Sequence, residues 1–517
     1  MNLRTAICLG AVLVIALSGR ESDAGERLYV QSKGSANPRL SPELDLVRNT
    51  KCKYLGTCRR GRPIFDVEAG DQAKVQSMSM SMKANAPQVQ PRRSRLLIRY
   101  ASREQKPQPE TLNTAGLKTV EDYERGGFLI VEPNTGISAE GVEALLADEA
   151  VVHACPDYVV ASLPINKVAI QQTAATGATP NDPAAGQLWG MKNIGASQVW
   201  PTSREATNVI VAVIDTGVDY NHPDLRANMW SKNGRYGYDF YDDDEDPMDE
   251  QDHGTHCAGT IAGVGNNGVG VVGVCWKAKI MAMRFMGPDG SGATSDAVKC
   301  IDWAVANGAH ILSNSWSGPD TSPELVEAIT RAEKKGVLFV AAAGNTEGRR
   351  NNDAAPFYPA SHNHPNIITV AAIDQNNAAS SFTHFGRMSV DIGAPGVGII
   401  STVRNGEYAS QDGTSMAAPH VAGAAALIWT NTFSTPVQDR TQMMKVRDLI
   451  YSNARPIPAL QNAWGHSAPA RVPGGVLDIS FLATPASPSN PLPPVQGPYG
   501  RRSIVENRAK VDPRLLR

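Results

Sequence analysis

The chain has 517 residues, and its 49 Lys and Arg residues nearly balance 51 Asp and Glu residues, so the formal net charge is −2. A balanced charge without a long basic run excludes a chain whose main partner is nucleic acid. With 42% hydrophobic and 19% charged residues, the chain is not a bulk disordered polymer. Its length corresponds to about three domains.

The amino terminus has the pattern of a secretory leader. Arg4 precedes an apolar run from Ala6 to Ser18, and small residues follow it. This run is too short to cross a bilayer of about 30 Å. It predicts a signal peptide over 1–24 and hence a secreted protein, or one in a secretory compartment. A buried amino-terminal helix is the alternative. Cys52 and Cys58 are close enough in sequence to form a disulfide, and the remaining cysteines cannot be paired from sequence.

A linker or pro-region is expected over 25–94, where Ser and Met alternate from Ser77 to Met82. The hydrophobic pattern then changes to short apolar runs, typical of strands, around one helix. This pattern predicts a small α+β unit over 95–163. The expected strands and helix are Leu96–Tyr100, Gly127–Val131, Ala139–Ala147 (helix), Val151–His153 and Tyr158–Val160. A polar segment over 164–180 reads as a second linker.

A larger unit is expected over 181–482, where apolar strands alternate with helices. Nearly continuous apolar strands are typical of a parallel sheet covered on both faces. The fold class is therefore α/β with three layers and a mostly parallel central sheet. The expected elements are strands Val209–Ile214, Ile280–Arg284, His310–Ser313 and Val337–Ala343, and helices His253–Ala262, Ser295–Ala306 and Pro323–Lys335. Residues 483–517 are Pro-rich and predict an extended tail.

Three polar residues lie at strand or helix ends in this unit. Asp215 ends a buried strand, His253 begins a helix, and Ser415 begins another after Gly413. A serine hydroxyl becomes a nucleophile when an imidazole takes its proton and a carboxylate orients that imidazole. The order Asp, His, Ser is one of the known chain orders of this triad. Asn345, at a strand end, supplies an amide that complements the helix terminus behind Ser415 as an oxyanion donor.

The stretches Asp215-Thr216-Gly217, His253-Gly254-Thr255-His256 and Gly413 to Pro419 resemble the signatures of the subtilisin-type serine peptidases. The resemblance extends over Asn181–Leu482. It implies a serine endopeptidase with Asp215, His253 and Ser415 as its triad and Asn345 as its oxyanion side chain. His256 lacks the Glu that a zinc-peptidase helix would need, so it is expected to be a packed helix residue. Cys257 is expected to be buried, as in the thermitase branch of the family.

The resemblance also assigns a substrate groove. Two segments match those that line the primary pocket and pair with the substrate backbone; they comprise Ser315, Trp316, Ser317 and Gly318, and Ala341, Ala342, Ala343 and Gly344. These segments contain no acidic residue, which favours a broad or apolar preference at P1, the residue before the cleaved bond. It argues against a kexin-like requirement for basic residues. Ser317 stands where the family usually has Gly.

Calcium is the cofactor that the resemblance implies. One site matches the side chains of Asp182, Asp224 and Asn267, with carbonyl oxygens from Val264, Val269 and Val271. A second would use Asp239, Asp242 and Asp244, which belong to the most acidic run of the chain. Clustered carboxylates suit a hard cation with six to eight oxygen ligands. A solvated acidic loop is the alternative for the second site.

The 95–163 unit resembles the propeptide that precedes many subtilisins, helps them to fold and blocks their groove with its carboxyl end. That end would lie near Val159 to Leu163. Pro164 is unfavourable after a cleaved bond, which leaves a cut elsewhere before Asn181 as the alternative. The prediction is a secreted, calcium-stabilised endopeptidase made as a self-processed precursor. Its partners would be protein or peptide substrates and its own propeptide. The alternatives are a silent peptide-binding pseudopeptidase and a processing protease of narrower specificity.

Overall fold

The computed structural model describes residues 95–134, 137–162, 180–466 and 471–483. It also gives the backbone pairing of short strands outside these ranges: β1 (Cys8–Leu9), β2 (Val12–Leu13), β3 (Glu26–Tyr29), β4 (Lys53–Thr57), β5 (Pro63–Val67) and β11 (Val168–Ala169). The expected signal peptide, the Cys52–Cys58 pair and the Pro-rich tail lie outside the described residues. Within them, no helix has the length and apolar character needed to cross a membrane.

A nine-stranded sheet forms the centre of the large domain, in the order β13-β14-β12-β16-β18-β19-β20-β24-β23. All neighbours are parallel except the last pair, β24 and β23, which is antiparallel. The strands are β12 (Glu205–Asp215), β13 (Gly237–Asp239), β14 (Lys277–Arg284), β16 (Ile311–Asn314), β18 (Leu338–Ala342), β19 (Ile367–Ile373), β20 (Ile392–Pro395), β23 (Arg455–Pro456) and β24 (Gly475–Val476). This confirms the predicted α/β fold class.

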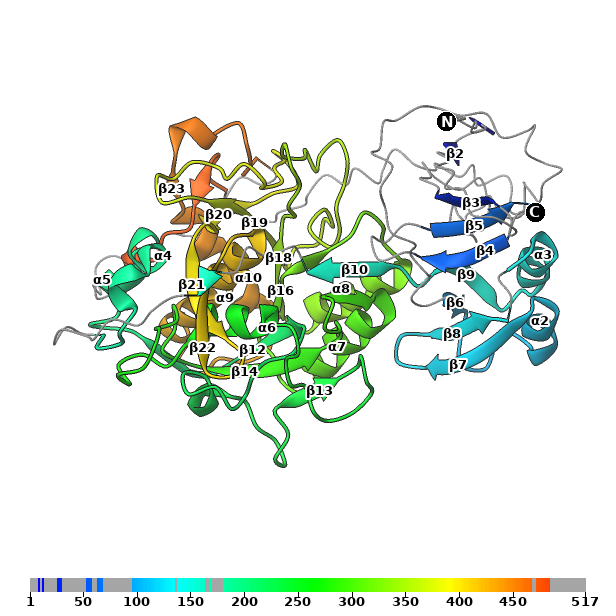
Figure 1. Ribbon diagram of the computed structural model, residues 1–517, viewed down its shortest axis with the longest axis horizontal. Helices are drawn as coiled ribbons and strands as arrows, with labels where there is room; N and C mark the ends of the chain where they lie inside the picture. The colour runs from blue at the N-terminus through cyan, green and yellow to red at the C-terminus, as the bar shows by residue number, and fades with distance from the viewer. Residues whose placement is uncertain are drawn as a thin grey trace.

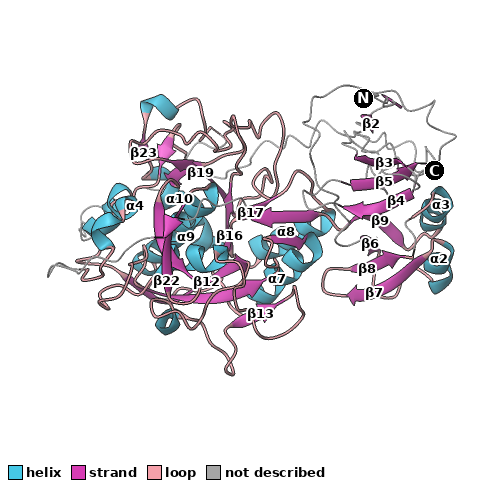
Figure 2. Cartoon of the chain, viewed as in Figure 1, coloured by secondary structure: helices cyan, strands magenta, loops and turns pink. Residues whose placement is uncertain are grey.

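Helices cover both faces of this sheet (Figures 1 and 2). One face carries α6, α9 and α10, and the other carries α7 and α8. Their bounds are α6 (His253–Ala262), α7 (Thr294–Ala306), α8 (Pro323–Lys334), α9 (Thr414–Thr432) and α10 (Arg440–Ser452). Smaller elements are α4 (Trp189–Asn193), α5 (Ala196–Val199), β15 (Ser291–Ala293), β17 (Trp316–Ser317), β21 (Ile399–Val403) and β22 (Glu407–Gln411), and the 3-10 turns η2 (Ala185–Gln187), η3 (Arg226–Asn228), η4 (Pro458–Leu460) and η5 (Ser480–Ala483).

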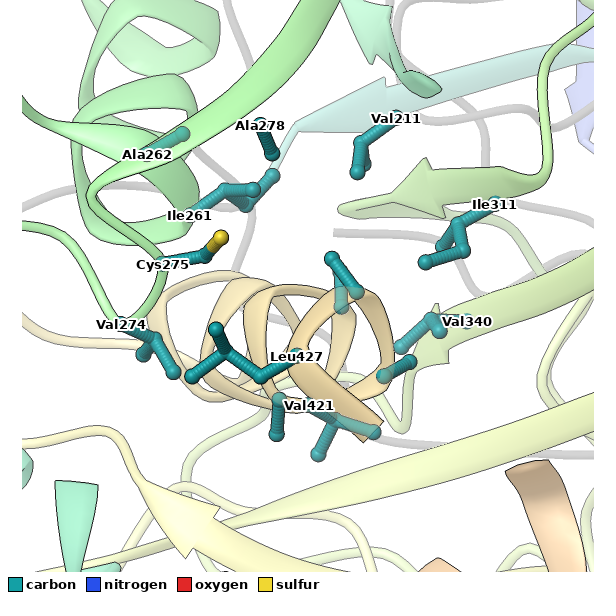
Figure 3. Packing of buried hydrophobic residues seen from close by; sticks show 14 of the residues in the cluster. Val211, Ile261, Ala262, Val274, Cys275, Ala278, Ile311, Val340, Val421 and Leu427 are labelled. Carbon is teal, nitrogen blue, oxygen red and sulfur yellow. The ribbon is translucent and has the colours of Figure 1, made fainter. Parts of the chain in front are cut away.

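The core shows why the strands are apolar at every position. Along β12, Val211 and Val213 pack against α6 and α9, whereas Ala212 and Ile214 face the α7 and α8 side. Figure 3 shows the first of these layers, in which Val421 and Leu427 of α9 meet side chains from several strands and from α6. Because successive side chains of a strand point to opposite faces, a sheet covered twice needs an apolar residue at each step.

The amino-terminal unit is a four-stranded antiparallel sheet in the order β7-β8-β6-β9, with two short helices. The elements are β6 (Leu96–Tyr100), α2 (Pro109–Thr114), β7 (Leu117–Tyr123), β8 (Phe128–Pro133), α3 (Ala139–Ala147) and β9 (Val151–Pro156). Helix α3 has its predicted bounds, and Ser138 caps it by accepting a hydrogen bond from the Gly141 amide. The prediction missed α2 and β7. Much of β7 is exposed and polar, which removes the hydrophobic alternation that would reveal it.

Strand β10 (Val159–Ser162) connects this unit to the large domain (Figure 1). It lies between β15 and β17 and is antiparallel to both. On the same side, Leu97, Phe128 and Ile130 of the small sheet join the apolar cluster that includes α7 and α8. The small unit therefore rests on the two helices and extends its last strand into the large domain.

Candidate active site

The carboxyl end of β12 and the start of α6 bring Asp215 and His253 together. Asp215 Oδ1 lies 2.7 Å from Nδ1 of His253, and both side chains are buried. Asp215 Oδ1 also accepts a hydrogen bond from the Thr216 amide at 2.8 Å. A carboxylate in this position holds the imidazole with Nδ1 protonated and stabilises the imidazolium. The Nε2 atom, which would act as the base, has no hydrogen-bond partner among the described residues.

Asp249 anchors the start of α6 and is a residue whose role the sequence did not reveal. Its Oδ1 accepts from the Thr216 hydroxyl at 2.9 Å, and its Oδ2 accepts from the Thr255 hydroxyl at 2.6 Å. Burial raises the pKa of Asp249, although these hydrogen bonds favour the carboxylate. Gly254 lets the start of α6 lie close to the loop that follows β12, because a Cβ at Gly254 would lie 2.0 Å from the Gly217 carbonyl oxygen. In the sequence Asp249 is only one member of the acidic run, and no local signal separates it.

Ser415 begins α9, and Pro419 shapes the helix around it. Proline has no amide hydrogen, so the Ser415 carbonyl lacks the usual donor four residues later. Two side chains supply donors to this carbonyl instead: the Ser315 hydroxyl at 3.0 Å and the Cys257 thiol at 3.4 Å. In return, the Ser415 hydroxyl donates to the Ser315 carbonyl at 3.0 Å. The nucleophile must therefore turn from Ser315 towards His253 Nε2 to be activated, and catalytic hydrogen bonds often form only when substrate is bound.

Asn345 follows β18 and lies beside the start of α9. Its Oδ1 accepts from the amide of Thr414 at 3.1 Å and from the Thr414 hydroxyl at 2.8 Å. Since the oxygen is committed to Thr414, the Nδ2 group remains as a donor. Gly413 leaves room for it, because a Cβ at that position would lie 3.1 Å from Nδ2. This arrangement suits an oxyanion donor next to the amides at the amino terminus of α9.

The two predicted groove segments lie on neighbouring strands. Ser315 joins β16 to β17, which contains Trp316 and Ser317, and Gly318 exchanges backbone hydrogen bonds of 2.8 Å with Tyr358. Ala341 and Ala342 end β18, and Ala343 and Gly344 follow them. The Trp316 side chain is fully buried against Phe285. The part of β17 that remains available for contact is therefore its backbone, which pairs with β10.

Strand β10 of the amino-terminal unit pairs with the first of these two segments. Ala161 pairs with Ser317 on one side and with Ser291 on the other, and Ser162 pairs with Trp316. The pairing is antiparallel and runs towards Ser315, whose backbone and side chain contact Ser415. The arrangement is the one that an extended peptide adopts when it adds a strand to a sheet edge.

Buried polar contacts hold the amino-terminal unit on α7 and α8. Asp157 caps α7 by accepting from the Ser295 amide at 2.9 Å and from the Ser295 hydroxyl at 2.7 Å. A carboxylate at a helix amino terminus is favoured by the helix dipole. Tyr123 donates to Asp302 at 3.0 Å. Two ion pairs, Arg99 with Glu327 and Lys299 with Glu121, complete the contact.

At the first predicted calcium site, two acidic side chains lie close together, and neither forms an ion pair with a described basic side chain. Asp182 and Asp224 are buried, and no ion pair joins either to a described basic side chain. Burial, and then the charge of Asp182, raise the pKa of Asp224 to about 6. Asn267 donates to Asp224 at 2.6 Å. The Asp224 carboxylate also accepts from the Val271 amide and the Tyr408 hydroxyl.

The loop carbonyls complete a donor set of oxygens. The carbonyl oxygens of Val264, Val269 and Val271 accept no hydrogen bond from the described part of the chain. Buried carboxylates and free carbonyls are the ligands that calcium prefers. The residues present therefore fit a calcium ion, which Asp182, Asp224, Asn267 and these three carbonyls would hold as a structural cation.

The second predicted site already contains a cationic side chain. Arg284 binds Asp239 at 2.7 Å, Asp242 at 3.0 Å and Glu250 at 2.7 Å. Oδ1 of Asp244 accepts a hydrogen bond from the Asp246 amide. A guanidinium that neutralises two of the three expected ligands makes this cluster a poorer fit to calcium than the first site.

Other reactive residue types in the domain have structural roles. His256 Nε2 lies 2.9 Å from the Ile399 carbonyl, and burial lowers its pKa to about 3, which confirms a packed neutral histidine. The four described cysteines are buried thiols that form no disulfide with one another: Cys155, Cys257, Cys275 and Cys300. Burial raises the pKa of the Cys257 thiol well above its usual range, so it is protonated and serves as a donor to Ser415.

A buried Asp–His pair, a serine at a helix start and an amide donor beside it, all on a parallel α/β sheet, define the class of serine hydrolases with a catalytic triad. The subtilase family model matches residues 206–470, about half of the chain. The chain belongs to the subtilase family.

Known relatives agree with this assignment. The chain is 42% identical over 251 residues to thermitase of Thermoactinomyces vulgaris, covering 48% of this chain and 85% of the relative. It is 41% identical over 251 residues to a thermophilic serine proteinase of Bacillus sp. (strain AK1), covering 48% of this chain and 59% of that protein. It is 41% identical over 249 residues to subtilisin BL of Lederbergia lenta, covering 47% of this chain and 86% of the relative.

Proposed function

We propose that this protein is a secreted serine endopeptidase, made as a precursor whose amino-terminal unit occupies the substrate groove until it is removed. The observation that carries the proposal is the 2.7 Å contact of Asp215 with His253 beside the helix that begins at Ser415. Membership of the subtilase family supports the same chemistry.

The residues have distinct tasks in the hydrolysis. His253 Nε2 takes the proton of the Ser415 hydroxyl as Oγ attacks the carbonyl carbon of the substrate. Asp215 stabilises the imidazolium, and the Asn345 side chain and the Ser415 amide hold the oxyanion. The imidazolium then protonates the leaving amine, which leaves an acyl ester on Ser415. Water, deprotonated by His253, attacks this ester and releases the acid.

The amino-terminal unit would keep the precursor inactive. Its strand β10 takes the place of a substrate between β15 and β17. The contacts of Asp157, Tyr123 and the two ion pairs add affinity away from the catalytic residues. Cleavage of the segment between this strand and the catalytic domain then leaves a non-covalent complex, from which the unit dissociates or is digested.

Calcium and specificity complete the proposal. A structural calcium ion bound by Asp182 and Asp224 would neutralise two buried carboxylates. The groove walls, Ser315 to Gly318 and Ala341 to Gly344, carry no acidic side chain. This composition favours a broad or apolar P1 preference, and it disfavours a processing protease that requires a basic residue.

One comparison tests the function directly. The full chain and its Ser415→Ala variant are expressed, their amino termini are sequenced, and both are assayed on casein. We expect the unmodified chain to lose its amino-terminal unit and to digest casein, and the variant to stay full length and inactive. If both stay full length and inactive, labelling with a serine-directed phosphonate distinguishes a peptidase that another protease activates from a pseudopeptidase: the former reacts after cleavage of its precursor and the latter does not.

A further inference from the structure

Asp252, the residue before His253, has a backbone conformation that suits glycine better than aspartate. Its φ angle is 104°, in the left-handed region where residues with a side chain are strained. Asp252 is also the N-cap of α6, yet its side chain forms no capping hydrogen bond with the helix. The His253 amide donates instead to Oε1 of Gln251 at 3.0 Å. The Asp252 side chain therefore has a task other than beginning the helix.

The Asp252 carboxylate binds the tip of the hairpin that β21 and β22 form. Its Oδ1 accepts from the backbone amide of Arg404 at 3.2 Å and from Nε of the same residue at 3.1 Å. The side chains of Asp252 and Arg404 are 13% and 34% exposed. An ion pair with this exposure contributes little by itself. The bond to the Arg404 amide, however, also fixes the backbone of the hairpin tip relative to the residue before His253.

The same hairpin contacts the segments that carry the other members of the triad. The Asn405 amide donates to Oδ2 of Asp219 at 2.9 Å, and Asp219 lies four residues after Asp215. Two hydroxyl groups of β21 donate to carbonyl oxygens in the first turn of α6, at 2.7 and 2.8 Å. Strand β22 ends at Gln411, four residues before Ser415. The hairpin is therefore bonded to the segments of the first two triad residues and continues into the segment of the third.

We propose that Asp252 is a positioning residue, whose contact with the hairpin tip keeps the imidazole of His253 against Asp215. The proposal rests on the peptidase function and adds to it a residue that touches neither substrate nor the reacting atoms. Backbone strain persists only where surrounding contacts enforce it, and it is often found at active sites. Here the two bonds from Arg404 enforce it. Without them, φ at position 252 relaxes to a negative value, which redirects the chain as it enters α6 and displaces His253.

Substitutions at position 252 separate the strain from the contact. Asp252→Ala removes the contact and keeps the strain, so kcat should fall about 10- to 100-fold, since a displacement of about 1 Å at a catalytic group can lower the rate about 10²-fold. Asp252→Gly also removes the contact but adopts the same φ without strain, so kcat should fall less than about 5-fold. Asp252→Asn keeps an oxygen acceptor and tolerates a positive φ, so it should retain most of the activity. In all three variants KM should change little, because the change acts on the catalytic base and not on the groove.

The partner of Asp252 gives a second test. Arg404→Ala should lower kcat about 2- to 5-fold in the otherwise unmodified enzyme, because the carboxylate keeps only the amide donor. It should have no further effect in the Asp252→Gly background, since the two residues act through one contact. Asn233→Ala is the matched control: Asn233 has a φ of 56° in an exposed turn, so this change adds the same kind of strain and should leave kcat unchanged.

Two kinetic results would overturn the proposal. One is an unchanged kcat for Asp252→Ala, and the other is an equal loss for Asp252→Ala and Asp252→Gly. Each variant is assayed at a temperature at which calorimetry shows it to be folded. If Asp252→Ala does not fold, Arg404→Ala decides in its place, because it leaves the residue at position 252 unchanged; a kcat equal to that of the unmodified enzyme would then contradict the proposal.

A readout without turnover separates this proposal from the peptidase function. In the full chain with Ser415→Ala, the Nδ1 proton between His253 and Asp215, whose atoms lie 2.7 Å apart, should give a slowly exchanging low-field signal in proton NMR. Asp252→Ala should remove or broaden this signal, whereas Asp252→Gly should preserve it. If the unmodified enzyme cleaves no peptide, the peptidase function fails and the NMR signal still decides the proposal. A signal that Asp252→Ala leaves unchanged would contradict the positioning role.

Discussion

Calcium removal should destabilise the protein in a way that depends on pH, because Asp224 is buried next to Asp182. Burial raises the pKa of Asp224 to about 6, from an ordinary value of 3.8, and the nearby Asp182 adds to this effect. A carboxylic acid whose pKa is raised in the folded state contributes stability that is fully present below its ordinary pKa. This contribution is lost as the pH rises through the folded value. The calcium-free protein should therefore lose stability between about pH 4 and pH 6.

The size of this effect follows from the shift in the pKa. About two pKa units correspond to about 3 kcal/mol at 1.36 kcal/mol per unit. Bound calcium opposes the loss, because it favours the ionised carboxylates; at about 100 times its Kd, a ligand stabilises a protein by about 2.7 kcal/mol. For a domain of this size, such a change corresponds to roughly 5–10 °C in the thermal midpoint.

The assay is differential scanning calorimetry of the Ser415→Ala variant, which cannot digest itself, in excess chelator or in calcium at pH 4.5 and pH 8. Calcium should raise the midpoint at pH 8 and have little effect at pH 4.5, and magnesium at equal ionic strength should not replace it. Asp224→Asn should abolish the calcium response. Asp242→Asn, which alters the Arg284 cluster, should preserve it. A midpoint at pH 8 that is the same in calcium and in chelator would refute the reasoning.

Three further predictions concern catalysis and latency. Asn345→Ala should lower kcat by about 10²–10³-fold with little change in KM, which is the effect of removing an oxyanion donor in subtilisin. An unchanged kcat in steady-state assays would show that Asn345 does not hold the oxyanion. Asp157→Ala should weaken inhibition by the separately added amino-terminal unit about 5- to 100-fold, because the buried Ser295 amide and hydroxyl lose their acceptor. An unchanged inhibition constant would contradict this capping role. Cys257→Ala should leave the catalytic domain folded and lower kcat less than 10-fold, since the Ser315 hydroxyl still donates to the Ser415 carbonyl. Inactivation of this variant despite an unchanged thermal midpoint would show that the thiol does more than hold the helix.

Much of the fold and the triad is determined by local sequence. Helix α6 begins and ends at its predicted residues, His253 and Ala262, and Gly263 follows it directly as the C-cap, which is a local signal. Asp215, His253 and Ser415 could be identified because each lies in a short signature with a fixed spacing. The α/β class could be predicted because the expected strands are apolar at nearly every position. Only a sheet that is covered on both faces requires such strands.

Only the tertiary structure decided which groups share a partner. Asp239, Asp242 and Asp249 look alike in the sequence, yet one guanidinium binds the first two and two threonines bind the third. Trp316 belongs to a segment that is predicted to line the groove, and only the structure shows that its side chain packs in the core against Phe285. The pairing of Val168 with Ser410, across 242 positions of the chain, has no local signal at all. Contacts between residues far apart in sequence depend on how the sheet and its loops come together, and that information is not contained in any single segment.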